Sequence, residues 1–166
     1  METTEAAFLI HSLGLLPHPE GGYYKEVYRS AESIQADALP LRYGGSRHFG
    51  TSIYFMLTST APSRFHRIKS DELWYFHTGG SLSLHILHQG EYRQTRIGSD
   101  VRAKEVFQVL IPAGAWFAAE SDPEPGFSLV SCAVMPGFDF ADFELAETSK
   151  LAAVYPEHQA LIKRLS

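Results

Sequence analysis

The chain has 166 residues, a length that fits one compact domain able to bury about 70% of its unfolded surface. Its net charge is −5 and no block of Lys or Arg occurs, so nucleic acid is not expected as a partner. The one cysteine, Cys132, cannot form an internal disulfide, and no apolar run approaches the roughly 18 residues that span a bilayer. Because the first residues lack a signal-peptide pattern, we expect a soluble, cytoplasmic protein with no membrane partner.

An amphipathic helix is predicted at the N-terminus, with Thr3 or Thr4 as its cap, Phe8 on its apolar face and Gly14 as its stop. Residues 17–22 then form a Gly- and Pro-rich turn, and residues 23–29 form a strand. Residues 30–47 are loop-like and are the best candidate for a mobile lid.

Eight short β-rich segments follow, separated by turns that contain Gly, Pro and Asp. They are residues 52–58, 64–68, 72–77, 82–88, 91–97, 106–111, 115–119 and 127–134. This spacing predicts an all-β fold, a double-sheet jelly roll. The tail is rich in helix formers and should fold as short outer helices. We therefore expect a single domain over residues 1–166, with a β-barrel core at about 20–136 and a helical tail at about 141–166.

Two motifs suggest a metal-binding β-barrel that has lost half of its ligands. The run from His66 to Gly79 has the spacing H-x-I-x3-E-x6-G and resembles the first cupin motif, with Ile68 where a second histidine stands. The run IPAGAWF, residues 111–117, resembles the second motif, with Phe117 where its last histidine stands. Two of the four usual ligand positions are therefore apolar.

Together with HPEGGYYKEVYRS at residues 18–30, these motifs resemble a cupin family of unknown function related to the deoxysugar epimerase-like jelly rolls. The resemblance extends from about Leu15 to about Leu161. It implies a cupin double-stranded β-helix with one internal pocket for a small-molecule ligand, usually in a dimer. We expect a homodimer with strand 23–29 at its interface, beside outward-facing residues such as Leu73 and Tyr75.

The proton-transfer hypothesis starts from strand alternation. His66 shares a strand face with Arg64, and Glu72 shares one with Trp74. If the first face lines the barrel interior, as the resemblance implies, His66 and Glu72 meet in the pocket. An imidazole beside a carboxylate is a proton-transfer pair, so we predict His66 as the base and Glu72 as its partner. The leading hypothesis is an epimerase or isomerase acting on a carbohydrate-like or polar ring substrate; the alternative is a non-catalytic ligand-binding or sensor cupin.

No cofactor is predicted, and a divalent metal is disfavoured. A catalytic metal site normally has three protein ligands and an open position, whereas the motif supplies His66 and Glu72 alone. His77 or His85 would have to complete the set from another strand position. A metal-dependent oxygenase is therefore the third hypothesis.

Six further residues are candidates for ligand binding. Trp74 and Phe117 would form a flat apolar wall, and Arg64 shares the face of the predicted base. Tyr54 and Ser52 share a face and could offer hydroxyl groups. The sixth is His85.

The direction of His85 depends on the turn at Gly79-Gly80. A two-residue hairpin loop pairs it with Trp74 and directs it into the pocket, whereas a three-residue loop reverses it. The sequence leaves both registers open. It also leaves open whether Glu26 reaches the pocket or an interface, while alternation places His77 on the face opposite Glu72.

Overall fold

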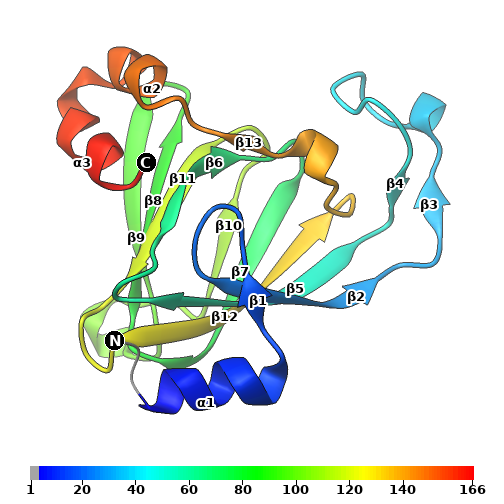
Figure 1. Ribbon diagram of the computed structural model, residues 1–166. Helices are drawn as coiled ribbons and strands as arrows, with labels where there is room; N and C mark the ends of the chain where they lie inside the picture. Colours follow the sequence, from blue (N-terminus) through cyan, green and yellow to red (C-terminus); the bar gives the residue numbers. More distant parts are fainter. Residues whose placement is uncertain (1–3) are drawn as a thin grey trace.

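The computed structural model describes residues 4–166, which form two packed antiparallel β-sheets with helices on their outer faces (Figure 1). From β5 onward, successive strands pass back and forth between the two sheets, except that β8 and β9 form a hairpin. This exchange is the arrangement of a jelly roll, and it confirms the predicted fold.

The strand bounds agree closely with the predicted segments. In spatial order the six-stranded sheet contains β1 (Leu16–Pro17), β2 (Tyr23–Arg29), β5 (Thr51–Thr58), β12 (Phe127–Met135), β7 (Asp71–Gly79) and β10 (Gln108–Ile111). The five-stranded sheet contains β13 (Glu144–Leu145), β6 (Ser63–Arg67), β11 (Trp116–Ser121), β8 (Leu82–His88) and β9 (Glu91–Ile97). The strands β1 and β13 extend the β structure beyond the predicted core of residues 20–136.

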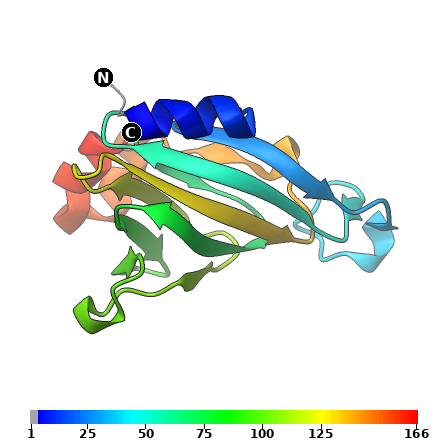
Figure 2. The same cartoon turned by 90° about the horizontal axis from the view of Figure 1, so that it is seen from below.

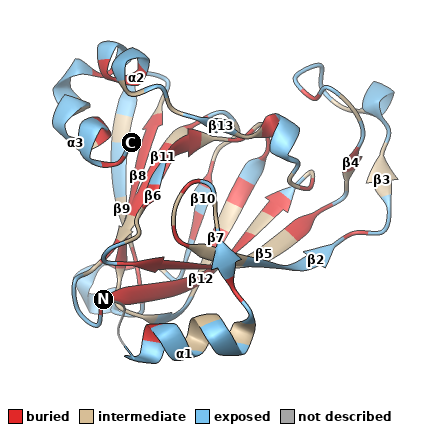
Figure 3. Cartoon of the chain, viewed as in Figure 1, coloured by how far each residue is buried: buried red, intermediate tan, exposed pale blue. Residues whose placement is uncertain are grey.

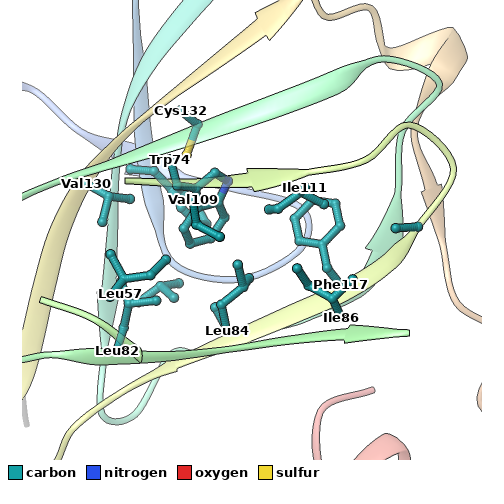
Figure 4. Packing of buried hydrophobic residues seen from close by; sticks show 14 residues of the cluster. Leu57, Trp74, Leu82, Leu84, Ile86, Val109, Ile111, Phe117, Val130 and Cys132 are labelled. Carbon is teal, nitrogen blue, oxygen red and sulfur yellow. The ribbon is translucent and has the colours of Figure 1, made fainter. Parts of the chain in front are cut away.

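Inward-facing side chains of both sheets fill the space between them (Figure 4). Strand β8 shows the alternation that produces this core, because Leu82, Leu84 and Ile86 all face the opposite sheet. Each fully buried side chain of this size contributes about 1.5–3 kcal/mol. The core cluster comprises Phe55, Leu57, Trp74, Leu82, Leu84, Ile86, Ile97, Val109, Ile111, Ala115, Phe117, Ala119, Val130 and Cys132.

Two glycines carry the chain from one sheet to the other between β7 and β8. Gly79 has φ +97°, and a Cβ atom there would lie 2.4 Å from the carbonyl oxygen of Phe127. A Cβ atom at Gly80 would lie 2.8 Å from the carbonyl oxygen of Glu124. The close approach of these backbones requires glycine at both positions.

Helices cover the outer face of each sheet. Helix α1 (Thr4–Leu13) lies across the six-stranded sheet (Figure 2) and buries Ala6 against Met56 and Phe127. Its sheet-facing side follows the i, i+3, i+4, i+7 series from Ala6, so the predicted Phe8 lies outside it and is exposed. The predicted cap Thr3 lies outside the described residues.

Helices α2 (Thr148–Val154) and α3 (Gln159–Arg164) pack on the five-stranded sheet. Their buried residues, including Leu151 and Ile162, contact Phe65 and Leu87 of the outer sheet face. The helices present exposed residues to solvent, while the strands beneath them are largely buried (Figure 3). The tail therefore folds as short outer helices, as predicted.

Residues 30–50 project from the sandwich as an arm that contains β3 (Ser33–Ile34), the 3-10 helix Ala36–Ala38 and β4 (Arg47–His48) (Figure 1). The predicted mobile lid is tied to the body by contacts that include two buried side chains. Tyr43 is buried, and its hydroxyl donates to the carbonyl of Lys69. Arg47 is also buried and forms a two-pronged ion pair with Asp142.

Parts of the outer face of the six-stranded sheet remain accessible. Leu73 and Tyr75, which we expect at a dimer interface, are half-buried there, and Leu110 is exposed. Association through this face remains a prediction. None of the helices formed by residues 4–166 has the length and apolar character needed to cross a membrane.

Candidate functional site

A cavity of about 300 Å³ lies between the inner face of the six-stranded sheet and strand β6. Its mouth is partly solvent-exposed, since the side chains of Glu26 and Arg29 are 39% and 34% exposed. Its floor is buried, and Glu72 there is 8% exposed. The lining residues are His18, Glu20, Tyr24, Glu26, Arg29, Thr51, Ile53, Phe55, His66, Ile68, Glu72, Cys132, Val134, Phe138 and Phe140.

The loop between β1 and β2 brings an acid and an imidazole into this cavity. Gly21 has φ +110°, and a Cβ atom there would lie 2.1 Å from the carbonyl oxygen of Pro62, so only glycine fits. The guanidinium of Arg64 donates to the carbonyl of Pro19 and holds the loop against β6. Figure 1 shows this loop reaching the space between the sheets.

Glu20 of this loop is the carboxylate that pairs with His66. Its Oε2 lies 3.0 Å from His66 Nε2, and its Oε1 accepts a hydrogen bond from the Ser63 hydroxyl at 3.2 Å. His66 Nδ1 lies 2.7 Å from the carbonyl oxygen of Arg64, which can only accept. Both ring nitrogens of His66 therefore face acceptors, and the ring is an imidazolium when Glu20 is ionised.

The pKa directions agree with an ion pair. Burial by itself disfavours both charged forms, but the attraction and hydrogen bond between the partners outweigh it. As a result the pKa of His66 is raised and the pKa of Glu20 is lowered. His66 and Glu72 line one cavity, as predicted, but the carboxylate beside the imidazole is that of Glu20.

Glu72 lies at the floor of the cavity on β7. Its Oε1 accepts a hydrogen bond from Trp74 Nε1 at 2.9 Å, and the Cys132 thiol bonds to the same carboxyl group. Burial first, and then the negative charge of Glu20, raise the pKa of Glu72 to about 7. This carboxyl group is therefore poised between its protonated and ionised forms at neutral pH.

His18 supplies a second imidazole. Its Nδ1 lies 3.4 Å from the Glu20 carboxylate and accepts from the backbone N–H of Glu20 at 3.3 Å; in the neutral ring this donation places the proton on Nε2. Burial lowers the pKa of His18, and this favours the neutral ring. Its Nε2 has no hydrogen-bond acceptor within residues 4–166, and the ring lines the cavity.

The mouth of the cavity depends on a register shift in β2. Glu26 opposes Ile53 and Tyr28 opposes Ser52, so Val27 has no partner in the ladder. Regular alternation would place Arg29 on the face opposite Glu26, and the shift brings the two residues to the same side. Arg29 donates to both carboxylate oxygens of Glu26. Of the two positions that the sequence left open for Glu26, the structure shows the one in the pocket.

Two predicted ligand contacts lie beneath the cavity. Trp74 is 1% exposed and Phe117 is fully buried, and neither lines the cavity. Trp74 instead holds the Glu72 carboxyl group, and the Phe117 ring packs 4.0 Å from the ring of His66. Trp74 and Phe117 therefore support Glu72 and His66 from the hydrophobic core, which lies beneath the cavity.

Three other predicted contacts face away from the cavity. On β5 the cavity side is formed by Thr51, Ile53 and Phe55, so alternation turns Ser52 and Tyr54 to the outer face. The Tyr54 ring lies there beside His77, whose ring is on the face opposite Glu72, as predicted.

Arg64 is the third of these contacts. It is exposed and binds the loop carbonyl of Pro19, although its own carbonyl accepts from His66.

Neither hairpin register applies to His85, because β7 and β8 belong to different sheets. On β8 the residues that alternate with the core positions face outward, and His85 is among them. Its Nδ1 lies 2.9 Å from the Tyr92 hydroxyl and its Nε2 lies 3.1 Å from Glu120. His85 therefore belongs to a cluster under helix α3, where Arg164 also binds Glu120.

The residues at the cupin ligand positions do not fit a metal ion. Ile68 and Phe117 offer no donor atom, and both nitrogens of His66 are engaged, by Glu20 and by the carbonyl of Arg64. Within residues 4–166 no group of three or more His, Cys, Asp or Glu side chains is arranged to hold a metal.

Sequence reasoning missed two central residues, His18 and Glu20, because their segment is a turn between strands. A usable signal was present, since a histidine and a glutamate two residues apart precede Gly21-Gly22 within the segment that carries the family resemblance. It also missed Phe138 and Phe140, whose position over the cavity is decided by the path of the chain after β12.

Comparisons with known proteins agree with this architecture. Residues 7–146 match the family described as Cupin superfamily (DUF985). An uncharacterised protein of Saccharomyces cerevisiae is 31% identical over 144 residues, which cover 81% of this chain and 71% of the yeast protein.

Two solved structures are similar over nearly their whole length. A hypothetical protein from Leishmania major has a TM-score of 0.87 and 38% identity, covering 99% of each chain. A Shewanella oneidensis protein has a TM-score of 0.86 and 39% identity, covering 100% of this chain and 98% of that one. Oxalate decarboxylase from Bacillus subtilis, at TM-score 0.54 and 16% identity over 90% of this chain and 36% of its own, shares the fold alone.

Proposed function

Because the chain belongs to the cupin superfamily, in the DUF985 family, we propose that its cavity is an acid–base site that isomerises or epimerises a small polar ring compound. The observation that carries this proposal is the Glu72 carboxyl group, which lines the cavity and has a pKa of about 7. A group with this pKa can both accept and donate a proton at neutral pH, as such reactions require.

In this proposal Glu72 replaces His66 as the proton-transferring group. An imidazolium with both nitrogens bonded has no free lone pair with which to remove a proton. The ion pair of His66 and Glu20 instead acts on Glu72 through its charges: the Glu20 carboxylate raises the pKa of Glu72, and the His66 imidazolium lowers it by a smaller amount. His66 and Glu20 are therefore positioning residues.

The neutral His18 ring is the proposed hydrogen-bond donor to the substrate. Its Nε2–H group can polarise a carbonyl oxygen while Glu72 removes a proton from the adjacent carbon. Return of the proton to the opposite face of the same carbon epimerises the compound; its return to the former carbonyl carbon, with transfer of a hydroxyl proton to the former carbonyl oxygen, isomerises it. Atoms and charges balance, and no oxidant or cofactor is consumed.

Solvent exchange tests the proposal. A thermal-shift screen of sugars, amino sugars, nucleosides and nucleobases would select binders, and each binder would be incubated in deuterated water and followed by NMR. We expect one binder to gain deuterium on carbon, at a rate that falls roughly 100-fold in Glu72→Gln. The matched variant Glu120→Gln, which removes a carboxylate outside the cavity, should keep the exchange.

Two results would contradict the proposal. Exchange that continues at the same rate in Glu72→Gln would assign proton transfer to another group. Binding without exchange for every compound would favour a sensor or ligand-binding role for the same cavity.

A further inference from the structure

The charges of the cavity are balanced in two pairs. At the mouth, both carboxylate oxygens of Glu26 accept from Arg29, with the closer contact at 2.6 Å. Deeper in the cavity, Glu20 lies 3.0 Å from His66. The two cationic side chains of the lining, Arg29 and His66, are therefore each already bound to a carboxylate.

Glu72 is the third carboxyl group of the lining, and it belongs to neither pair. It is 8% exposed and lines the cavity, yet within residues 4–166 it forms no ion pair. Its two hydrogen-bond donors, the Trp74 indole and the Cys132 thiol, are uncharged. A buried carboxylate without a cation is unstable, so this end of the cavity favours the arrival of one positive charge.

Aromatic rings surround the remaining space. Tyr24, Phe55, Phe138 and Phe140 all line the cavity. The Phe138 and Phe140 ring centroids lie 5.0 Å apart, and the His18 ring contacts Tyr24 at 4.6 Å. The faces of such rings are partly negative and attract cations, especially where water is excluded. An anionic ligand, by contrast, would meet no unpaired cation in the lining.

We infer that the cavity binds a compact ring compound with one positively charged nitrogen, which lies against the Glu72 carboxylate while the ring packs among the aromatic side chains. The inference rests on the proposed function in placing the ligand in this cavity. Amino sugars and protonated nitrogen heterocycles belong to this class. Sugar phosphates and nucleotides do not.

Binding of such a cation should displace a proton. The titratable groups that act on Glu72 from the neighbouring elements are Glu20, His66 and the Cys132 thiol, and with burial they set its pKa at about 7. A cation beside the carboxylate favours its ionised form. Below pH 7, ligand binding should therefore release up to one proton from Glu72.

Three probes that share a phenyl ring and differ in charge test the inference: benzylammonium is cationic, benzyl alcohol is neutral and benzoate is anionic. NMR titration of the full chain at pH 7 should give a dissociation constant for benzylammonium at least roughly tenfold lower than that for benzyl alcohol, the scale of one charge-assisted hydrogen bond. Benzoate should bind most weakly. Equal affinities, or tighter binding of benzoate, would overturn the inference.

The variant Glu72→Gln should abolish the preference for benzylammonium, whereas Glu120→Gln should retain it. A preference that survives in Glu72→Gln would overturn the assignment of this carboxylate. If that variant does not fold, calorimetry of the wild-type protein at pH 6 in two buffers of different ionisation enthalpy gives a second measurement. Proton release on binding of benzylammonium supports the inference, and its absence overturns it.

The two proposals fail separately. Carbon-bound deuterium exchange on a neutral compound, without a preference for benzylammonium, would support the proposed function and refute the cationic ligand. Cation-selective binding lost in Glu72→Gln, with no exchange in any compound, would support the cationic ligand and refute catalysis.

Discussion

This protein has two histidine–carboxylate contacts of nearly equal length, yet the pKa of the imidazole is raised at one and lowered at the other. In the cavity, His66 Nε2 lies 3.0 Å from Glu20; on the outer face of the other sheet, His85 Nε2 lies 3.1 Å from Glu120. Burial disfavours the imidazolium in both places. Attraction to Glu20 nevertheless raises the pKa of His66, whereas the pKa of His85 is lowered.

The difference comes from how far other groups offset burial, which is the largest cause that lowers the pKa of His85. Glu20 is buried, and His66 is the cation beside it. Glu120 is partly exposed and also binds the guanidinium of Arg164, whose positive charge opposes protonation of His85. At His66, the ion pair with Glu20 and the hydrogen bond to the carbonyl of Arg64 outweigh burial, whereas at His85 the attraction to Glu120 does not.

The largest expected effect is on stability. Glu20→Gln breaks a buried ion pair, and we expect the free energy of unfolding at pH 7 to fall by about 3–5 kcal/mol. The matched substitution Glu120→Gln, at a partly exposed pair, should lower it by about 1 kcal/mol or less. Urea denaturation of both variants measures the difference, and equal losses would contradict the distinction between the two sites.

A somewhat smaller effect concerns Glu72 and pH. Its pKa is raised from 4.5 to about 7 in the folded state, so between these values the folded protein retains a proton that the unfolded chain releases. The free energy of unfolding should then decrease as pH rises through this window, by about 3 kcal/mol from this group. In Glu72→Gln this decrease should be absent.

Urea denaturation at pH 5 and pH 8 compares the two proteins. Glu120→Gln serves as the control for loss of a carboxylate outside the cavity, and it should keep the decrease that belongs to Glu72. If the wild-type protein and Glu72→Gln lose stability in parallel over this range, the Glu72 carboxyl group does not carry the raised pKa.

The smallest effects are shifts in the titration of the two histidines, which leave the fold intact. Ring nitrogen chemical shifts should show His66 protonated above pH 6.5, the ordinary imidazole pKa, and His85 neutral below it. The variant Arg164→Gln should raise the pKa of His85, because it removes a nearby positive charge, and should leave His66 unchanged. A titration of His85 that does not respond would contradict the role assigned to Arg164.

Local pattern was sufficient for most of the fold. Alternating apolar residues and turn-forming Gly and Pro predict strands close to their observed bounds, because period-two burial and turn chemistry are properties of short segments. The same alternation places His77 opposite Glu72. It failed in β2, where a one-residue register shift moves Arg29 to the cavity side, since a β-bulge has no consistent signature in this sequence.

The candidate site was also predictable from the sequence in some respects and not in others. Sequence spacing alone determined that His66 and Glu72 stand where a cupin presents its inner ligands, and that Ile68 and Phe117 leave that set incomplete. Which carboxylate pairs with His66 was decided by the tertiary structure, because Glu20 is 46 positions away in the chain and comes within hydrogen-bond distance only when the β1–β2 loop packs on β6. The tertiary structure also decided the direction of the His85 side chain. A strand that follows two glycines can either pair with the preceding strand or cross to the other sheet, as β8 does. That choice depends on how the sheets as a whole bury their apolar faces, a property of the packed molecule that no local window of the chain contains.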